Sequence, residues 1–307
     1  MRILFFGTTD FSRAMLKALI EGGHEIAGVV TLPDQPDSRG HRAIPTPVKL
    51  LAKDFDLKVF EAENLKDPSF AESLEALKAD IGVVVSFKIL PRAVFTAPRL
   101  GTLNVHPSLL PKLRGPAPVR WALIEGLAET GVTTFILDEK VDTGDIILAE
   151  PIEIPLDFNY AELFERIIPV AERVMLHSLE LVQNGTYCGK KQNPSEATKA
   201  PKLTPEFCRI DWNKPASELH NLVRALSPEP GAWTELDGTR FKVLKARQTD
   251  ESGSPGEILS CSPRTGLIIA CGSGALEILQ IQAPGKKSLE CGAFLCGCKL
   301  SKGKVCI

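Results

Sequence analysis

Short apolar runs alternate with amphipathic segments along the N-terminal part of the chain. The runs at residues 3–6, 26–31 and 81–86 have the length of buried strands, and residues 15–20 place apolar side chains at helical spacing. The same patterns predict further strands at 57–60 and 101–106 and further helices at 48–51 and 70–77. Strands that alternate with helices indicate an α/β fold with a doubly wound, mostly parallel, Rossmann-like sheet.

The C-terminal part has a different pattern. After a helical segment at 216–225, short apolar runs are separated by Gly, Ser and Pro, which is typical of a small β-barrel of the OB type. These runs lie at 241–244, 256–259, 267–270 and 276–279. Between the two parts lies a polar, lysine-bearing stretch without hydrophobic periodicity. The expected organisation is therefore a domain of residues 1–187, a basic linker of 188–205 and a barrel domain of 206–307.

Two polar side chains lie at the end of the strand expected at 101–106. Residues two apart on a strand share a face, so Asn104 and His106 point the same way before Pro107 ends the ladder. Functional residues of doubly wound sheets gather at this carboxyl end. An amide beside an imidazole can polarise a carbonyl and handle a proton, although a histidine that only caps a strand has the same sequence pattern.

A second polar cluster, Val141 to Asp145, interrupts two apolar runs and therefore predicts a turn between strands. Its Asp142 can pair with His106, which would favour the charged imidazole and fix its tautomer. An Asp-Thr-Gly-Asp sequence is most often only a turn. Taken together, Asn104, His106 and Asp142 form a candidate catalytic group.

Several other classes of protein are disfavoured. With 44% hydrophobic and 24% charged residues the composition is that of a globular protein, and no run reaches the length of a membrane span. The start lacks an export signal, so we expect a cytoplasmic protein. The turn after the first strand, beginning at Gly7, lacks the G-x-G-x-x-G pattern, which argues against a nicotinamide cofactor.

The eight cysteines all lie at or beyond Cys188 and lack the paired C-x₂-C spacing of structural zinc sites. We therefore expect free thiols and no bound metal. A zinc site remains the alternative.

Charge is distributed unevenly. Residues 201–307 carry 14 Lys+Arg against 11 Asp+Glu, whereas the rest carry 22 against 27. A positive C-terminal part suits contact with phosphate. The loop at 33–42, with Arg39 and Arg42, is a candidate RNA contact, although a solvated surface loop has the same composition.

The stretch from Asn104 to Pro118, together with Val141 to Asp145, forms a recognisable signature. It resembles that of the folate-dependent formyltransferases, and supporting matches extend the resemblance over essentially the whole chain. Two of these, Arg209 to Trp212 and Pro230 to Trp233, point to methionyl-tRNA as the formyl acceptor. The resemblance implies transfer of the formyl group of 10-formyltetrahydrofolate to the amino group of initiator methionyl-tRNA, by a monomer without a metal.

The resemblance also implies roles for individual residues. Catalysis would fall to Asn104, His106 and Asp142. Folate would lie along Ser108, Leu109, Leu110 and Pro111, with help from Leu90 and Pro91. The tRNA would contact Arg39, Arg42, Lys190, Lys191, Lys199 and Lys202.

The chain departs from the family pattern in three places. Thr9 stands where the family usually has proline. The loop from Val85 to Pro91 is one residue short and has Lys88 where glycine is usual, and cysteines near the end replace common arginines. Three other functions share part of the signature: formylation of a sugar-nucleotide amine, formylation of glycinamide ribonucleotide, and tRNA binding by a protein with an inactive catalytic domain. An assay with the competing amines distinguishes them.

Overall fold

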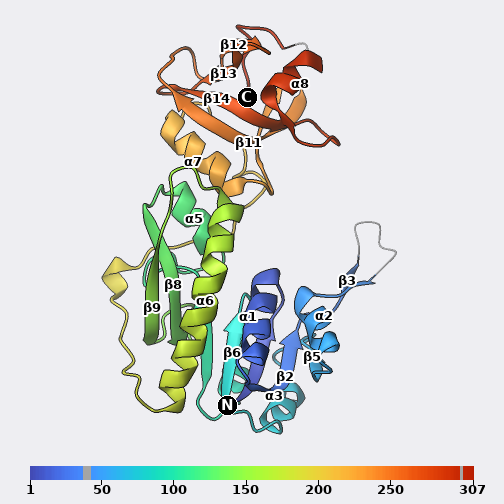
Figure 1. Cartoon of the computed structure of the whole chain (residues 1–307), viewed down its shortest axis with the longest axis vertical. Coiled ribbons are helices and arrows are strands. Elements are labelled where there is room, and N and C mark those ends of the chain that lie inside the picture. The colour runs from blue at the N-terminus through green and yellow to red at the C-terminus, as the bar shows by residue number, and fades with distance from the viewer. Residues whose placement is uncertain (37–42, 298–299) are drawn as a thin grey trace. The chain divides into compact units, whose positions relative to one another are not determined.

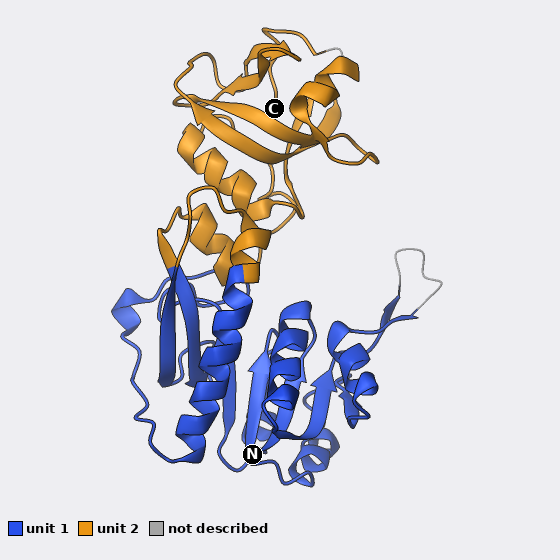
Figure 2. Cartoon of the chain, viewed as in Figure 1, with its two compact units in different colours: residues 1–116, 130–152, 166–200 blue, residues 117–129, 153–165, 201–307 orange. Residues whose placement is uncertain are grey.

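The computed structural model describes residues 1–36, 43–297 and 300–307. These residues form two compact units, coloured blue and orange in Figure 2. Unit 1 consists of residues 1–116, 130–152 and 166–200, and unit 2 of residues 117–129, 153–165 and 201–307.

Unit 1 is built on a seven-stranded sheet with the order β5-β2-β1-β6-β7-β8-β9 (Figure 1). The strands are β1 (Arg2–Gly7), β2 (Glu25–Thr31), β5 (Val59–Glu61), β6 (Ile81–Val85), β7 (Thr102–His106), β8 (Glu129–Ile136) and β9 (Ile146–Glu153). From β5 to β7 all neighbours are parallel, and β8 pairs with β7 in the antiparallel sense. This confirms the predicted mostly parallel α/β sheet.

The central strand β1 explains why helices cover both faces of the sheet. Its residues Ile3, Leu4, Phe5 and Phe6 are all fully buried. Because alternate side chains point to opposite faces, each face needs an apolar cover. Leu4 and Phe6 belong to a core that includes side chains of α3 and α4. The helices outside unit 2 are α1 (Asp10–Glu21), α2 (Pro47–Asp54), α3 (Pro68–Glu75) and α4 (Arg92–Phe95).

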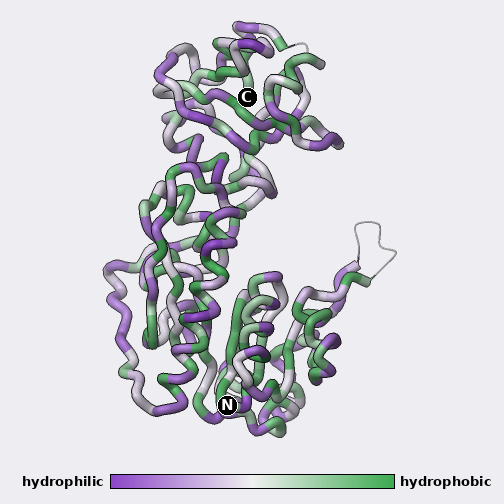
Figure 3. Tube along the Cα trace, viewed as in Figure 1, coloured by the Kyte–Doolittle hydropathy of each residue, from purple (hydrophilic) through white to green (hydrophobic). Residues whose placement is uncertain are grey.

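Three further elements complete the described part of unit 1. A short hairpin, β3 (Gln35–Pro36) with β4 (Ala43–Ile44), follows β2. The long helix α6 (Tyr160–Gln183) contributes residues to both units. The polar segment after it, drawn mostly purple and white in Figure 3, contains the single-turn helix η1 (Pro194–Glu196).

Unit 2 contains an antiparallel sheet with the order β10-β11-β14-β13-β12, and β15 pairs with β14. The strands are β10 (Ala232–Leu236), β11 (Thr239–Thr249), β12 (Ile258–Ser262), β13 (Gly266–Ala270), β14 (Ala275–Gln282) and β15 (Leu289–Glu290). The helices are α5 (Pro118–Ile124), α7 (Ala216–Leu226) and α8 (Cys291–Gly297).

The last residues of the chain join the two edges of this sheet. On one side Ile307 exchanges two backbone hydrogen bonds with Glu235 of β10, each of 2.8 Å. On the other side the carbonyl of Lys304 accepts from Ile258 of β12 at 2.8 Å. Edge strands of an open sheet leave backbone groups unpaired. The tail therefore closes the sheet into the small barrel that the sequence predicts.

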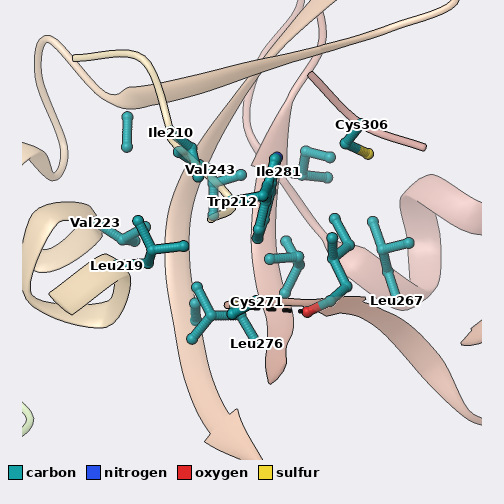
Figure 4. Close-up of a cluster of buried hydrophobic side chains, with 14 of the residues drawn as sticks. Ile210, Trp212, Leu219, Val223, Val243, Leu267, Cys271, Leu276, Ile281 and Cys306 are labelled. Atoms are coloured by element: carbon teal, nitrogen blue, oxygen red, sulfur yellow. Dashed lines mark hydrogen bonds between the residues drawn. The ribbon is translucent and has the colours of Figure 1, made fainter. Parts of the chain in front are cut away.

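The barrel encloses an apolar core, part of which Figure 4 shows. Two of the sequence matches are explained by this core. The segment Arg209 to Trp212 runs beside β10. The Ile210 N–H donates to the Trp233 carbonyl at 2.8 Å, and the Trp233 N–H donates to the Cys208 carbonyl at 2.9 Å. The buried Trp212 indole donates to the hydroxyl of Thr234 at 2.9 Å. No helix of the described residues is long and apolar enough to cross a membrane.

Candidate active site

Asn104 and His106 lie on β7, near the middle of the unit 1 sheet. Asn104 is opposite Val84 of the parallel strand β6 and Phe135 of the antiparallel strand β8. Its side chain is half-buried, and none of the described residues hydrogen-bonds its amide group. The amide is therefore a hydrogen-bond donor held at the carboxyl end of the strand and available to a bound molecule.

The His106 ring is 5% exposed and is fixed by the backbone. Its Nε2 lies 3.0 Å from the carbonyl oxygen of Leu113. Because a carbonyl only accepts, this nitrogen carries the proton and donates. The other ring nitrogen, Nδ1, faces Asp142 Oδ2 at 3.9 Å. That separation exceeds hydrogen-bond length, so Nδ1 faces the carboxylate without a hydrogen bond to it.

Asp142 is held in an uncommon backbone conformation that directs its carboxylate inward. Its φ is +55°, in the left-handed region, which Asp adopts more readily than most residues. The Gly115 backbone N–H donates to Asp142 Oδ2 at 2.8 Å. Two residues later, a Cβ on Gly144 would lie 1.8 Å from the carbonyl oxygen of Ile136, so only glycine fits there. The structure thus brings Asp142 to within 3.9 Å of His106, and Asn104 lies two residues before His106 on the same strand.

The predicted folate stretch after β7 forms a tightly bonded loop. Thr133 of β8 donates through its hydroxyl to the Ser108 carbonyl at 2.7 Å and accepts from the Leu110 N–H at 3.1 Å. Ser108 is fully buried and its hydroxyl donates to the Lys112 carbonyl at 2.7 Å, so its side chain shapes the loop. Leu109 and Pro111 are the members of this stretch with accessible surface.

A second predicted folate contact lies in the loop after β6. Leu90 is buried in the apolar core beside α4, and Pro91 precedes that helix. The neighbouring Ile89, which sequence reasoning did not single out, is 77% exposed. Ile89 is thus the apolar side chain of this loop that is open to a ligand, and Lys88 beside it is also exposed. An isolated apolar residue in a loop gives no periodic signal in the sequence.

The four lysines proposed for tRNA contact are all exposed. Lys190 exchanges two backbone hydrogen bonds of 2.9 Å with Ile146 of β9, and Lys199 pairs with Arg114. Lys190, Lys191 and Lys199 therefore belong to unit 1, whereas Lys202 belongs to unit 2. Arg39 and Arg42 lie outside the described residues. Within the described ranges, no cluster of His, Cys, Asp and Glu could hold a metal ion.

Comparison with known proteins agrees with this geometry. The family described as "Formyl transferase" matches residues 1–179, and "Formyl transferase, C-terminal domain" matches residues 202–299. The chain belongs to the formyltransferase family. Among its relatives, the methionyl-tRNA formyltransferase of Porphyromonas gingivalis is 39% identical over 98% of this chain and 97% of that protein. The same enzyme of Chlorobium phaeovibrioides is 43% identical over 99% and 97%.

Solved structures show the same fold at lower identity. HypX from Aquifex aeolicus, in complex with tetrahydrofolic acid, has a TM-score of 0.64 and 23% identity over 96% of this chain and 47% of that chain. An N-formyltransferase from Helicobacter canadensis, with folinic acid and dTDP-3-aminofucose, has a TM-score of 0.67 and 19% identity over 91% and 99%. These likenesses show that the chain shares its fold with both proteins.

Proposed function

We propose that this formyltransferase transfers the formyl group of 10-formyltetrahydrofolate to the α-amino group of initiator methionyl-tRNA. Full-length relatives at about 40% identity that carry this activity support the choice of acceptor. The observation that carries the chemistry is the meeting of Asn104, His106 and Asp142 at one sheet edge. Of the functions considered from the sequence, this one accounts for both the polar site of unit 1 and the barrel of unit 2.

The reaction needs stabilisation of negative charge. The amine nitrogen attacks the formyl carbon, the carbonyl oxygen becomes an oxyanion, and the bond from carbon to folate N10 then breaks. Hydrogen-bond donors aimed at that oxygen lower the barrier. The unpartnered amide of Asn104 supplies one donor. A protonated Nδ1 of His106 supplies a second, because Nε2 is already bonded to Leu113.

The reaction also needs movement of a proton. The attacking amine loses one proton, and N10 gains one when the C–N bond breaks, so tetrahydrofolate leaves neutral at that nitrogen. Asp142 is the base that we assign to the amine proton, acting directly or through water. Its Oδ2 accepts from the Gly115 N–H and faces His106 Nδ1 at 3.9 Å. This route requires neither a covalent intermediate nor a metal.

The folate contacts follow the family resemblance, and the tRNA contacts are supported by exposure and charge. We assign Leu109, Leu110, Pro111, Leu90, Pro91 and the buried Ser108 to the wall of the folate site, with Ile89 as its most exposed apolar member. Lys190, Lys191, Lys199 and Lys202 would meet the phosphate backbone of the tRNA, as would Arg39 and Arg42. We keep residues 1–187, 188–205 and 206–307 as the proposed catalytic, linking and tRNA-binding parts.

One assay tests the acceptor. Purified protein is given 10-formyltetrahydrofolate and, in parallel, charged initiator tRNA, an amino-sugar nucleotide or glycinamide ribonucleotide. Formylation of the charged tRNA with the highest kcat/KM is the expected result. Transfer to the amino-sugar nucleotide at a higher kcat/KM would overturn the assignment and give unit 2 another role.

A further inference from the structure

The turn formed by Asp142, Thr143 and Gly144, called the Asp142 turn below, is hydrogen-bonded to a residue far away in the sequence, Gln192. The Gln192 Nε2 donates to two carbonyl oxygens of the turn, that of Asp142 at 3.0 Å and that of Gly144 at 2.9 Å. Its Oε1 accepts from Arg114 Nε at 3.1 Å and from Arg114 Nη2 at 2.6 Å. Both ends of this half-buried amide are thus used, and all these residues lie in unit 1.

These contacts link Asp142, Gly115, Arg114 and Gln192 in a closed series that returns to Asp142. Asp142 is held at its backbone carbonyl by Gln192 and at its side chain by the N–H of Gly115. Gly115 follows Arg114 directly, and Arg114 in turn holds Gln192. Asp142 has a φ of +55°. The hydrogen bond to its carbonyl restrains its backbone, and the hydrogen bond to its carboxylate restrains the direction of its side chain.

The segment that carries Gln192 is itself anchored on both sides. Lys190 pairs with Ile146, which follows the turn, and Ala200 donates its N–H to the Arg114 carbonyl at 2.7 Å. A Cβ on Gly115 would lie 2.7 Å from the carbonyl oxygen of Ala200, so the backbones approach closely there. The position of Gln192 is therefore set by backbone pairing and not by its side chain alone.

We propose that Gln192 is a positioning residue for formyl transfer. It holds the Asp142 turn so that the carboxylate faces His106 Nδ1, and it touches neither substrate. This proposal rests on the proposed function and adds a residue to it. A carboxylate displaced by about 1 Å can cost up to about 100-fold in rate even when binding is unchanged.

The decisive variant is Gln192→Glu, which has nearly the same shape. It keeps an oxygen for Arg114 but loses the N–H donors and places a carboxylate oxygen against the carbonyls of Asp142 and Gly144. We expect kcat to fall by about 10- to 100-fold, with the KM values for folate and charged tRNA little changed. The matched control is Asn193→Asp, the same change one residue later, because the hydrogen bonds that the Asn193 side chain makes to described residues go to Ser195 and Glu196 and not to the Asp142 turn. This control should keep the wild-type kcat.

A double-mutant cycle separates positioning from general stability. In an Asp142→Asn background the carboxylate is already gone, so Gln192→Glu should cause little further loss of kcat. An equal fold-loss in both backgrounds, or a wild-type kcat for Gln192→Glu, would overturn the proposal. If the thermal midpoint of Gln192→Glu drops, the uncharged variant Gln192→Met is used in the same cycle. Failure of the wild-type protein to formylate charged tRNA would instead refute the proposed function, so the two failures are distinct.

Discussion

The site of unit 1 and the barrel interior of unit 2 both bury ionisable groups, but with different partners. His106 and Asp142 are 5% and 9% exposed, and each has a polar partner of fixed geometry in Leu113 or Gly115. In the barrel, Cys271 and Cys306 are equally buried and lie in an apolar core, where the Cys271 thiol donates to the backbone carbonyl of Ile269 at 3.8 Å (Figure 4). Burial alone therefore does not make a reactive site. What distinguishes the unit 1 site is that two ionisable side chains, His106 and Asp142, face each other at 3.9 Å.

The largest expected effect comes from removing the ionisable ring of the polar site. His106→Gln keeps a side chain that can donate a hydrogen bond to the Leu113 carbonyl but loses the group that faces Asp142. We expect kcat for formylation of charged tRNA to fall by about 10²- to 10⁴-fold, the range of general acid–base contributions. Rapid-quench measurement at saturating substrates checks this, with circular dichroism as the control for folding. A kcat within a factor of a few of wild type would mean that His106 only caps β7.

The next effect concerns the binding of tRNA by the exposed lysines Lys199 and Lys202, and not the rate of formyl transfer. Lys199→Glu combined with Lys202→Glu should raise the KM for tRNA several-fold, leave kcat nearly unchanged and flatten the salt dependence, because each lost phosphate contact lowers the slope by roughly one. Lys66→Glu, another exposed lysine, is the control for total charge. An unaltered salt slope in the double variant would exclude these lysines from the tRNA contact.

A smaller effect is expected from a change in the barrel core, which should lower the free energy of unfolding and leave kcat unchanged. Trp212→Phe removes the indole donor that bonds Thr234 in the barrel core. A buried hydrogen bond contributes about 1 kcal/mol, and the hydroxyl of Thr234 keeps its contact with the Ile307 carbonyl at 3.1 Å. We therefore expect the free energy of unfolding to fall by about 1 kcal/mol with kcat unchanged. A loss of kcat at full stability would show that unit 2 influences the reaction itself.

The last prediction concerns the reactivity of the cysteine thiols. It tests whether the thiols buried in the barrel core are unreactive, in contrast to the polar site of unit 1. Burial raises the pKa of Cys271 and Cys291 to about 11 and that of Cys306 to about 12. A raised pKa means less thiolate, the reactive form, at any lower pH. At about pH 8 a disulfide reagent should modify the exposed Cys188 and Cys296 while these three stay unmodified in the folded protein.

Peptide mapping identifies the modified sites, and unfolded protein is the positive control. Modification of Cys271 in the folded state would mean that the barrel opens readily. Elemental analysis of the same sample tests the expectation of no bound metal, which one equivalent of zinc would refute.

The alternation of strands and helices in unit 1 could be predicted from the sequence because buried parallel strands are continuous apolar runs. The placement of Asn104 beside His106 was predictable because residues two apart on a strand share a face. Asp142 follows β8, which is antiparallel to β7, so strand direction does not bring it to His106, and its pairing was indicated by the family signature. The short strands of the barrel were predictable from Gly, Ser and Pro turns.

Other features could not be predicted, for physical reasons. The closure of the barrel by Lys304 to Ile307 is made by backbone hydrogen bonds, which leave no side-chain pattern. Gln192 lies in a polar segment without periodicity, so the sequence indicates a linker and not a contact with the turn. The burial of Ser108 depends on its bond to the Lys112 carbonyl, which is a property of the folded loop.

The most direct test of the central claim uses Asn104→Ala, because none of the residues that the structure describes hydrogen-bonds this amide. The claim is that the side chains at the carboxyl end of β7 act on the reacting carbonyl and not on binding. Single-turnover formylation of charged initiator tRNA and the Kd for folate are measured on the same preparation. We predict a rate about 10²- to 10³-fold lower, the usual cost of one oxyanion donor, with the Kd little changed. A near-normal rate, or a loss explained entirely by a weaker Kd, would contradict the account.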